Sequence, residues 1–164
     1  MIVYLDSVER NPFCSVVKQR VEDSVRYFPE IDLVYVGMID KKRKSMGICY
    51  GEMNLIALAD SYAPTYCTIF HELFHIVQWQ DKTLSQTEAF CSIAAMSRMP
   101  PELVDEDYIS YVGYGTVSPT EFPRICRHAL AIPKRHNYIA YTKKAIAPPD
   151  KREPLKCAPL VALE

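Results

Sequence analysis

The stretch that decides the fold runs from residue 64 to residue 80 and reads PTYCTIFHELFHIVQWQ. Pro64 is tolerated in a first helical turn, where its missing N–H group is not needed, and no further proline or glycine follows before Gln80. At about 100° per residue, most of the apolar side chains fall into one wide sector. They are Tyr66, Ile69, Phe70, Leu73, Phe74, Ile76 and Val77. The stretch therefore predicts an amphipathic helix that buries one face.

The motif HELFH, residues 71–75, lies in the middle of this predicted helix. Residues four apart share one face of a helix, so His71 and His75 can both reach one zinc ion at about 2.0–2.1 Å. Glu72 flanks that face, where a carboxylate can take a proton from a water molecule without binding the metal. The motif predicts a zinc site with Glu72 as general base. The alternative to a metal site is a structural role, in which both histidines make their hydrogen bonds within a core helix.

A third protein ligand must come from another element, because a catalytic zinc ion has three protein ligands and one open position. Glu88 is the predicted ligand, because it follows His75 by 13 residues, enough for the chain to turn and return as an antiparallel helix. Its expected neighbours on the facing side of this second helix are small, which close helix packing requires. They are Cys91, Ser92 and Ala95. The sequence thus predicts two helices that share one ion.

Other roles stay open for these residues. Glu88 also completes a capping box with Ser85, in which its carboxylate would accept a hydrogen bond from the Ser85 backbone N–H. Cys91 is the next candidate ligand, whereas His128 or His136 would require a long return of the chain.

The remaining sequence predicts strands and further helices. Strands are expected at residues 2–5, 31–37, 47–50 and 54–58, and the last two are expected to form a hairpin. Helices are expected up to about residue 27, at 85–99 and at 120–131.

The composition fits a single domain. A chain of 164 residues with 49% hydrophobic residues can bury one core, expected within about residues 1–104, with a proline-punctuated extension over 105–164. Its 19 basic and 20 acidic residues give a net charge of −1, which favours neither nucleic-acid nor membrane partners. Without a basic signal-peptide start or an apolar run of about 18 residues, a cytoplasmic location is expected. The six cysteines lack a Cys-x-x-Cys pair and are expected to be buried free thiols, with disulfides as the alternative.

The motif HELFH followed by Glu88 resembles the gluzincin branch of the zincin metallopeptidases. Residues 47–104 are similar to the small ImmA/IrrE-like metallopeptidases and to minimal single-domain gluzincins, through the runs NLIAL, IFHE, TEAF and MPPEL. This resemblance implies an α+β fold over residues 1–164. A small mixed β-sheet would pack on a backing helix and on the active-site helix, with a second helix carrying the third zinc ligand.

The resemblance also implies how a substrate would bind. In such proteins the edge strand beside the metal pairs with an extended peptide, which points to residues 51–58 and, within them, to Asn54 and Ile56. An ordinary hairpin strand is the alternative. Ser92 stands where many gluzincins have an acidic residue that supports the histidines, so their orientation has no explanation yet. The candidate oxyanion donors lie downstream and are Tyr111, Tyr114 and His128.

These features predict a zinc-dependent metallopeptidase with one zinc ion per chain and a peptide or protein as substrate. Glu72 would take a proton from water and pass it to the leaving amine. Two other functions stay open. One is a regulatory or interaction module in which zinc joins the two helices, and the other is an amidase acting on a non-peptide bond.

Overall fold

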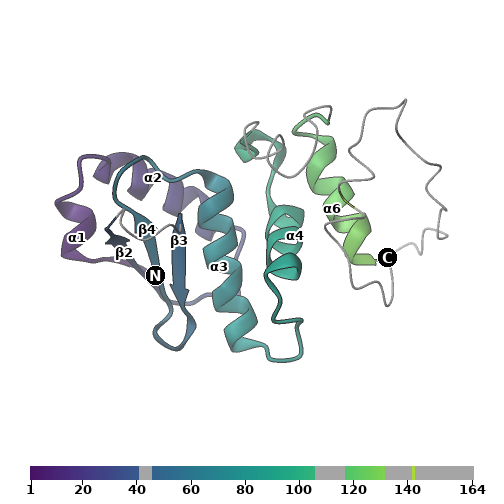
Figure 1. The fold of residues 1–164 in the computed structure, drawn as a ribbon, viewed down its shortest axis with the longest axis horizontal. Coiled ribbons are helices and arrows are strands. Elements are labelled where there is room, and N and C mark those ends of the chain that lie inside the picture. Colours follow the sequence, from purple (N-terminus) through teal and green to yellow (C-terminus); the bar gives the residue numbers. More distant parts are fainter. Residues whose placement is uncertain (41–45, 106–116, 132–141, 143–164) are drawn as a thin grey trace.

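The computed structural model describes residues 1–40, 46–105, 117–131 and 142. Within them the chain forms a four-stranded mixed sheet and five α-helices (Figure 1). The strands are β1 (Ile2–Tyr4), β2 (Val34–Ile39), β3 (Gly47–Tyr50) and β4 (Leu55–Ala59). The helices are α1 (Asp6–Glu9), α2 (Cys14–Val25), α3 (Tyr66–Gln80), α4 (Glu88–Arg98) and α6 (Glu121–Ala131). The predicted α+β class is confirmed.

The sheet has the strand order β1-β2-β4-β3. β1 and β2 run parallel, as do β2 and β4. α1 and α2 lie between β1 and β2 in the chain, and β3 lies between β2 and β4, so neither parallel pair is joined by a tight turn. β3 and β4 form the predicted hairpin, joined by the short 3-10 helix η1 (Gly51–Met53) and by Asn54. Asn54 has a positive φ of 48°, which asparagine tolerates better than most residues. The expectation of an edge strand at residues 51–58 is wrong, because β4 pairs on both sides and β3 lies at the edge.

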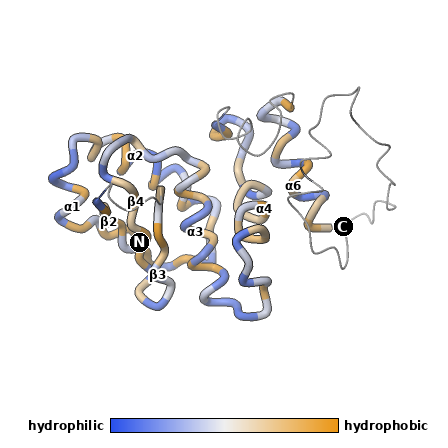
Figure 2. Tube along the Cα trace, viewed as in Figure 1, coloured by the Kyte–Doolittle hydropathy of each residue, from blue (hydrophilic) through white to orange (hydrophobic). Residues whose placement is uncertain are grey.

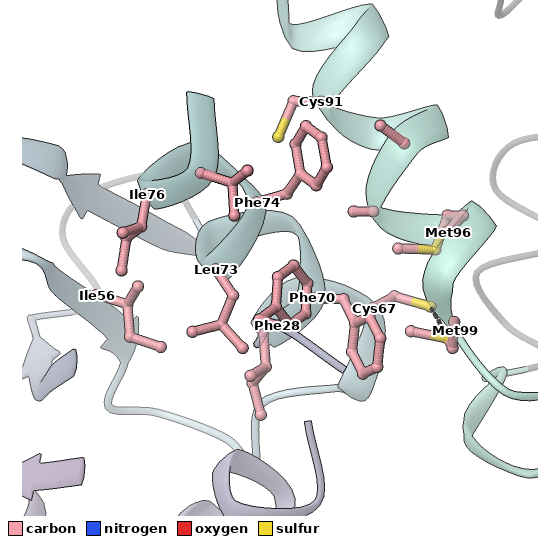
Figure 3. Close-up of a cluster of buried hydrophobic side chains, with 14 of the residues drawn as sticks. Phe28, Ile56, Cys67, Phe70, Leu73, Phe74, Ile76, Cys91, Met96 and Met99 are labelled. Atoms are coloured by element: carbon pink, nitrogen blue, oxygen red, sulfur yellow. Dashed lines mark hydrogen bonds between the residues drawn. The ribbon is translucent and has the colours of Figure 1, made fainter. Parts of the chain in front are cut away.

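α3 lies at the centre of the packing. It contacts the sheet and α2 on one side and α4 on the other, and α6 packs on α4 beyond it (Figure 1). Figure 3 shows the side chains that fill these layers, with Leu73 and Ile76 directed toward Ile56 and with Phe70 beside Phe28. The Phe28 and Phe70 ring centroids are 5.3 Å apart. The wide apolar sector predicted for α3 therefore packs against both the sheet and the chain that follows α2.

Threonine caps fix where α3 and α4 begin. The Thr65 side chain accepts a hydrogen bond from the Thr68 backbone N–H at 3.1 Å, so α3 begins at Tyr66. The Thr87 side chain accepts one from the Phe90 backbone N–H at 3.3 Å, so α4 begins at Glu88. Both starts fall two to three residues later than expected.

The outer parts of the fold follow the same pattern of one buried face per helix. Figure 2 shows hydrophobic strands β3 and β4 beside α3, and hydrophilic and hydrophobic residues alternating along α6. The buried face of α6 contains Phe122, Cys126 and Ala129. No helix among the described residues is long and apolar enough to cross a membrane.

The cysteines of the described ranges are free thiols, as expected, but Cys14 and Cys49 are only partly buried. They are Cys14, Cys49, Cys67, Cys91 and Cys126. Cys157 lies outside the described residues.

Candidate metal centre

The two motif histidines meet, half-buried, on the side of α3 that faces the start of α4. His71 and His75 are one helical turn apart, and their Nε2 atoms are 3.0 Å from each other. Burial and the neighbouring His75 lower the pKa of His71, although Glu88 opposes this effect. The lowered pKa favours the neutral imidazole, which has a lone pair that a metal ion can bind.

Glu88 reaches the same point from α4. Its Oε2 atom lies 3.1 Å from His71 Nε2 and 3.3 Å from His75 Nε2. The capping box with Ser85 is wrong, because Thr87 caps α4 and the Glu88 carboxylate lies against the histidines. The expected return of the chain as a second helix thus brings all three predicted ligands together.

The spacing of these three atoms fits a metal ion. Ligand atoms about 2.05 Å from a tetrahedral zinc ion lie about 3.3 Å from one another. The three observed separations are 3.0, 3.1 and 3.3 Å. Two imidazole nitrogens and one carboxylate oxygen form a ligand set that divalent transition metals bind. The residues present therefore fit a metal ion with little adjustment.

Cys91 is a second candidate for the third ligand. His71, His75 and Cys91 offer ligand atoms that all lie within 4.8 Å of one another and could hold a metal ion. The Cys91 thiol is fully buried and donates a hydrogen bond to the His71 backbone carbonyl at 3.3 Å. Burial, with the nearby Glu88 and Glu72, raises the pKa of Cys91 well above its usual range. Because a thiol must lose its proton to bind a metal, these surroundings disfavour it as a ligand.

Glu72 lies beside the three ligands with little exposure to solvent. Its side chain is 6% exposed, and it lines the same pocket of about 510 Å³ as His71, His75 and Glu88. Burial, helped by the nearby Glu88 carboxylate, raises the pKa of Glu72 to about 8. A carboxyl group with such a pKa can exchange a proton near neutral pH, as a general base or acid must.

The edge strand β3 forms the opposite wall of this pocket. Gly47, Ile48, Cys49 and Gly51 line it from that side. A Cβ atom on Gly47 would lie 2.7 Å from Glu72 Oε1, and one on Gly51 would lie 2.5 Å from the Trp79 side chain. Both positions therefore need glycine for β3 and η1 to lie this close to α3.

The other predicted site residues are not brought to this pocket. Ile56 is fully buried in the core, so it has no surface for a substrate, and its predicted role is wrong. Asn54 lies at the end of η1, where its side chain accepts a hydrogen bond from Gln80, and it does not line the pocket. His128 lies in α6, on the far side of α4 from α3. Tyr111, Tyr114 and His136 lie outside the described residues.

The structure also shows which residues orient the two histidines. Gln78 Oε1 lies 2.8 Å from His75 Nδ1, and Ser92 Oγ lies 3.3 Å from His71 Nδ1. The sequence predicts Ser92 on the facing side of the second helix, but it gives neither Ser92 nor Gln78 a role in orienting a histidine. The missing acidic residue after Glu88 is thus replaced by neutral partners.

Comparisons with known proteins give no family for this chain. No protein-family model, no curated protein and no solved structure matches it. The established feature is therefore the group formed by His71, His75 and Cys91, which could hold a metal ion, with the Glu88 carboxylate beside it.

Proposed function

We propose that the protein is a zinc-dependent metallopeptidase. The observation that supports this most directly is the convergence of His71 Nε2, His75 Nε2 and Glu88 Oε2 at 3.0 to 3.3 Å beside the buried Glu72 carboxyl. Two histidines, one glutamate and an adjacent carboxyl that is not a ligand form the residue set of a hydrolytic zinc centre.

Glu88, rather than Cys91, is the proposed third ligand. Its carboxylate already contacts both imidazoles, whereas the Cys91 thiol is protonated and donates to a backbone carbonyl. Bound zinc would supply a Lewis acid that polarises a peptide carbonyl and lowers the pKa of a water molecule.

Glu72 is the proposed general base. Its carboxyl group would take a proton from the attacking water and deliver it to the departing amine nitrogen. The raised pKa of about 8 belongs to the protein without metal, and a nearby dication favours the carboxylate form that accepts the proton. The low exposure of Glu72 keeps this proton exchange away from bulk water.

The position of β3 supports a peptide as the substrate. Among the described residues β3 pairs with β4 alone, and its residues Gly47, Ile48 and Cys49 line the pocket that contains Glu72. An extended peptide can add to such an edge as a further strand, through backbone hydrogen bonds that demand little of its sequence. The proposed substrate is therefore an extended segment of polypeptide.

The test is peptide cleavage by protein with a measured zinc content. The wild-type protein should contain about one zinc ion per chain and cleave members of a mixed peptide library, as detected by mass spectrometry. Glu72→Gln should keep the zinc and lose at least about 100-fold in cleavage rate. Glu102→Gln, an exposed glutamate away from the pocket, is the control. Zinc-loaded wild-type protein that cleaves no peptide, or full activity in Glu72→Gln, would refute the proposal.

A further inference from the structure

Gln78 is a buried polar residue that joins two parts of the metal centre. Its side chain is on α3, is 2% exposed, and makes hydrogen bonds at both ends of its amide group. Oε1 lies 2.8 Å from His75 Nδ1, and Nε2 lies 2.5 Å from the backbone carbonyl oxygen of Ser85. The amide therefore connects the second histidine to the segment between α3 and α4.

The contact with Ser85 decides which atom donates in each of the two hydrogen bonds made by the Gln78 amide. A carbonyl oxygen can only accept, so the Gln78 amide nitrogen must face Ser85, and Oε1 must face His75. Because Oε1 can only accept, His75 Nδ1 must carry the proton that it receives. His75 Nε2 is then left with a lone pair, and this is the atom that faces His71 and Glu88.

The backbone of Gln78 holds the same connecting segment. Gln86 Nε2 donates to the Gln78 backbone carbonyl at 2.9 Å and to the Leu84 backbone carbonyl at 2.9 Å. α4 and its ligand Glu88 begin only two residues after Gln86. Gln78 thus contacts both His75 and the segment that leads to Glu88.

We infer that Gln78 is a positioning residue of the metal centre, an inference that rests on the proposed zinc site. It selects the His75 tautomer whose Nε2 can bind a metal, and it anchors the segment that delivers Glu88. An amide is suited to both tasks. A carboxylate could accept from His75 Nδ1, but it would place an oxygen against the Ser85 carbonyl and lose the second bond.

The tautomer of His75 is the first test, and it needs neither metal nor a variant. Imidazole 1H–15N correlation spectra of the metal-free wild-type protein, at a pH where His75 is neutral, should show the proton on Nδ1. In Gln78→Leu the population should shift toward the Nε2–H form. A wild-type His75 with its proton on Nε2 would overturn the inference.

Zinc affinity is the second test, measured by competition with a chelator. Gln78→Leu should bind zinc about 10 to 100 times more weakly than the wild type. Gln78→Glu should also bind more weakly and should show faster amide hydrogen exchange at residues 84–87, because it loses only the Ser85 contact. Gln80→Leu, an exposed glutamine on the same helix and outside the pocket, should match the wild type.

The two proposals fail in different ways. Equal zinc affinity in the wild type and in Gln78→Leu would overturn the positioning role and leave the zinc site standing. A wild-type protein that binds no zinc would overturn both.

Discussion

At the scale of single residues, Gly47 decides how close the edge strand comes to Glu72, the proposed general base. The space that a Cβ atom would need is occupied by Glu72 Oε1 at 2.7 Å and Glu72 Cγ at 2.8 Å. Glu72 is buried and lines the pocket, so an added Cβ would push its carboxyl away from β3. The Glu72 carboxyl thus lies directly against the backbone of β3 as well as on its own helix.

Substitution of this glycine should therefore separate catalysis from metal binding. Gly47→Ala should displace the Glu72 carboxyl and lower the rate of peptide cleavage at least about tenfold, while zinc content stays at that of the wild type. Gly37→Ala in β2 is the matched control, because its Cβ would meet only Leu5 and other atoms at 3.2 Å or more, away from the pocket. Equal cleavage rates in Gly47→Ala and the wild type would show that the close approach has no role.

The identity of the third ligand is also a question at this scale. Glu88→Gln should lower zinc affinity at least about tenfold, and Cys91→Ala should change it by less than about threefold. Cobalt-substituted wild-type protein should lack the intense near-ultraviolet absorption that a thiolate ligand produces. The opposite order of affinities, or a thiolate absorption band that disappears in Cys91→Ala, would assign the ligand to Cys91.

Most of the ligand set could be predicted from the sequence, and its supporting residues could not. The spacing of His71, Glu72 and His75 carries its own geometry, because four residues make about one helical turn. Gln78 and Ser92 gave no comparable signal. Their roles depend on which histidine nitrogen each one meets, and that is set by the packing of α3 against α4 and its connecting segment.

At the scale of elements, one ion pair ties the end of α4 to the chain that follows α2. The Arg98 guanidinium donates to both carboxylate oxygens of Glu30, at 2.7 and 3.0 Å. It also lies over the rings of Phe28 and Phe74, at 5.2 and 5.1 Å from their centroids. The hydrogen bonds from Arg98 lower the pKa of Glu30 below its ordinary value.

This lowered pKa predicts a pH-dependent contribution to stability. A carboxyl whose pKa is lower in the folded state stabilises the fold above its unfolded pKa, and the contribution is lost as the pH falls through the folded pKa. Glu30→Gln should therefore lower the free energy of unfolding at pH 7, by roughly 1 kcal/mol or less because the pair is partly exposed. Urea unfolding should show this difference shrinking as the pH falls below about 4, with Glu102→Gln as control. A difference independent of pH would contradict the role of the charge.

The existence of the elements was easier to predict than their pairing. The sequence predicts the hairpin of residues 47–50 and 54–58, but its prediction of the edge strand is wrong. A hairpin sequence does not say which of its strands meets a third one, and here β4 pairs with β2 over Leu55–Ala59. The starts of α3 and α4 moved because Thr65 and Thr87 act as caps that the apolar pattern does not reveal.

At the scale of the whole molecule, the candidate metal centre lies between two layers of the fold. α3 packs on the sheet, α4 packs on α3, and α6 packs on α4 (Figure 1). The histidines belong to α3 and Glu88 to α4, so a bound ion would join the two layers. Metal binding should therefore stabilise the fold in addition to any catalytic role.

Metal removal should accordingly lower the melting temperature. Free zinc at 100 times its dissociation constant adds about 2.7 kcal/mol to the stability of the folded state. For a chain of this size, that corresponds to about 5–10 °C. Calorimetry with and without a chelator should show this difference, and His75→Ala should abolish it. A melting temperature unaffected by the chelator in zinc-loaded protein would contradict a site shared by α3 and α4.

The central claim is that His71, His75 and Glu88 bind one zinc ion beside Glu72. Anomalous X-ray diffraction at the zinc absorption edge, from crystals of the zinc-loaded wild-type protein, tests it most directly. The expected result is one zinc ion bonded to His71 Nε2, His75 Nε2 and a Glu88 carboxylate oxygen at about 2.0–2.2 Å. A zinc ion at another position, or one bonded to Cys91 Sγ in place of Glu88, would contradict the claim.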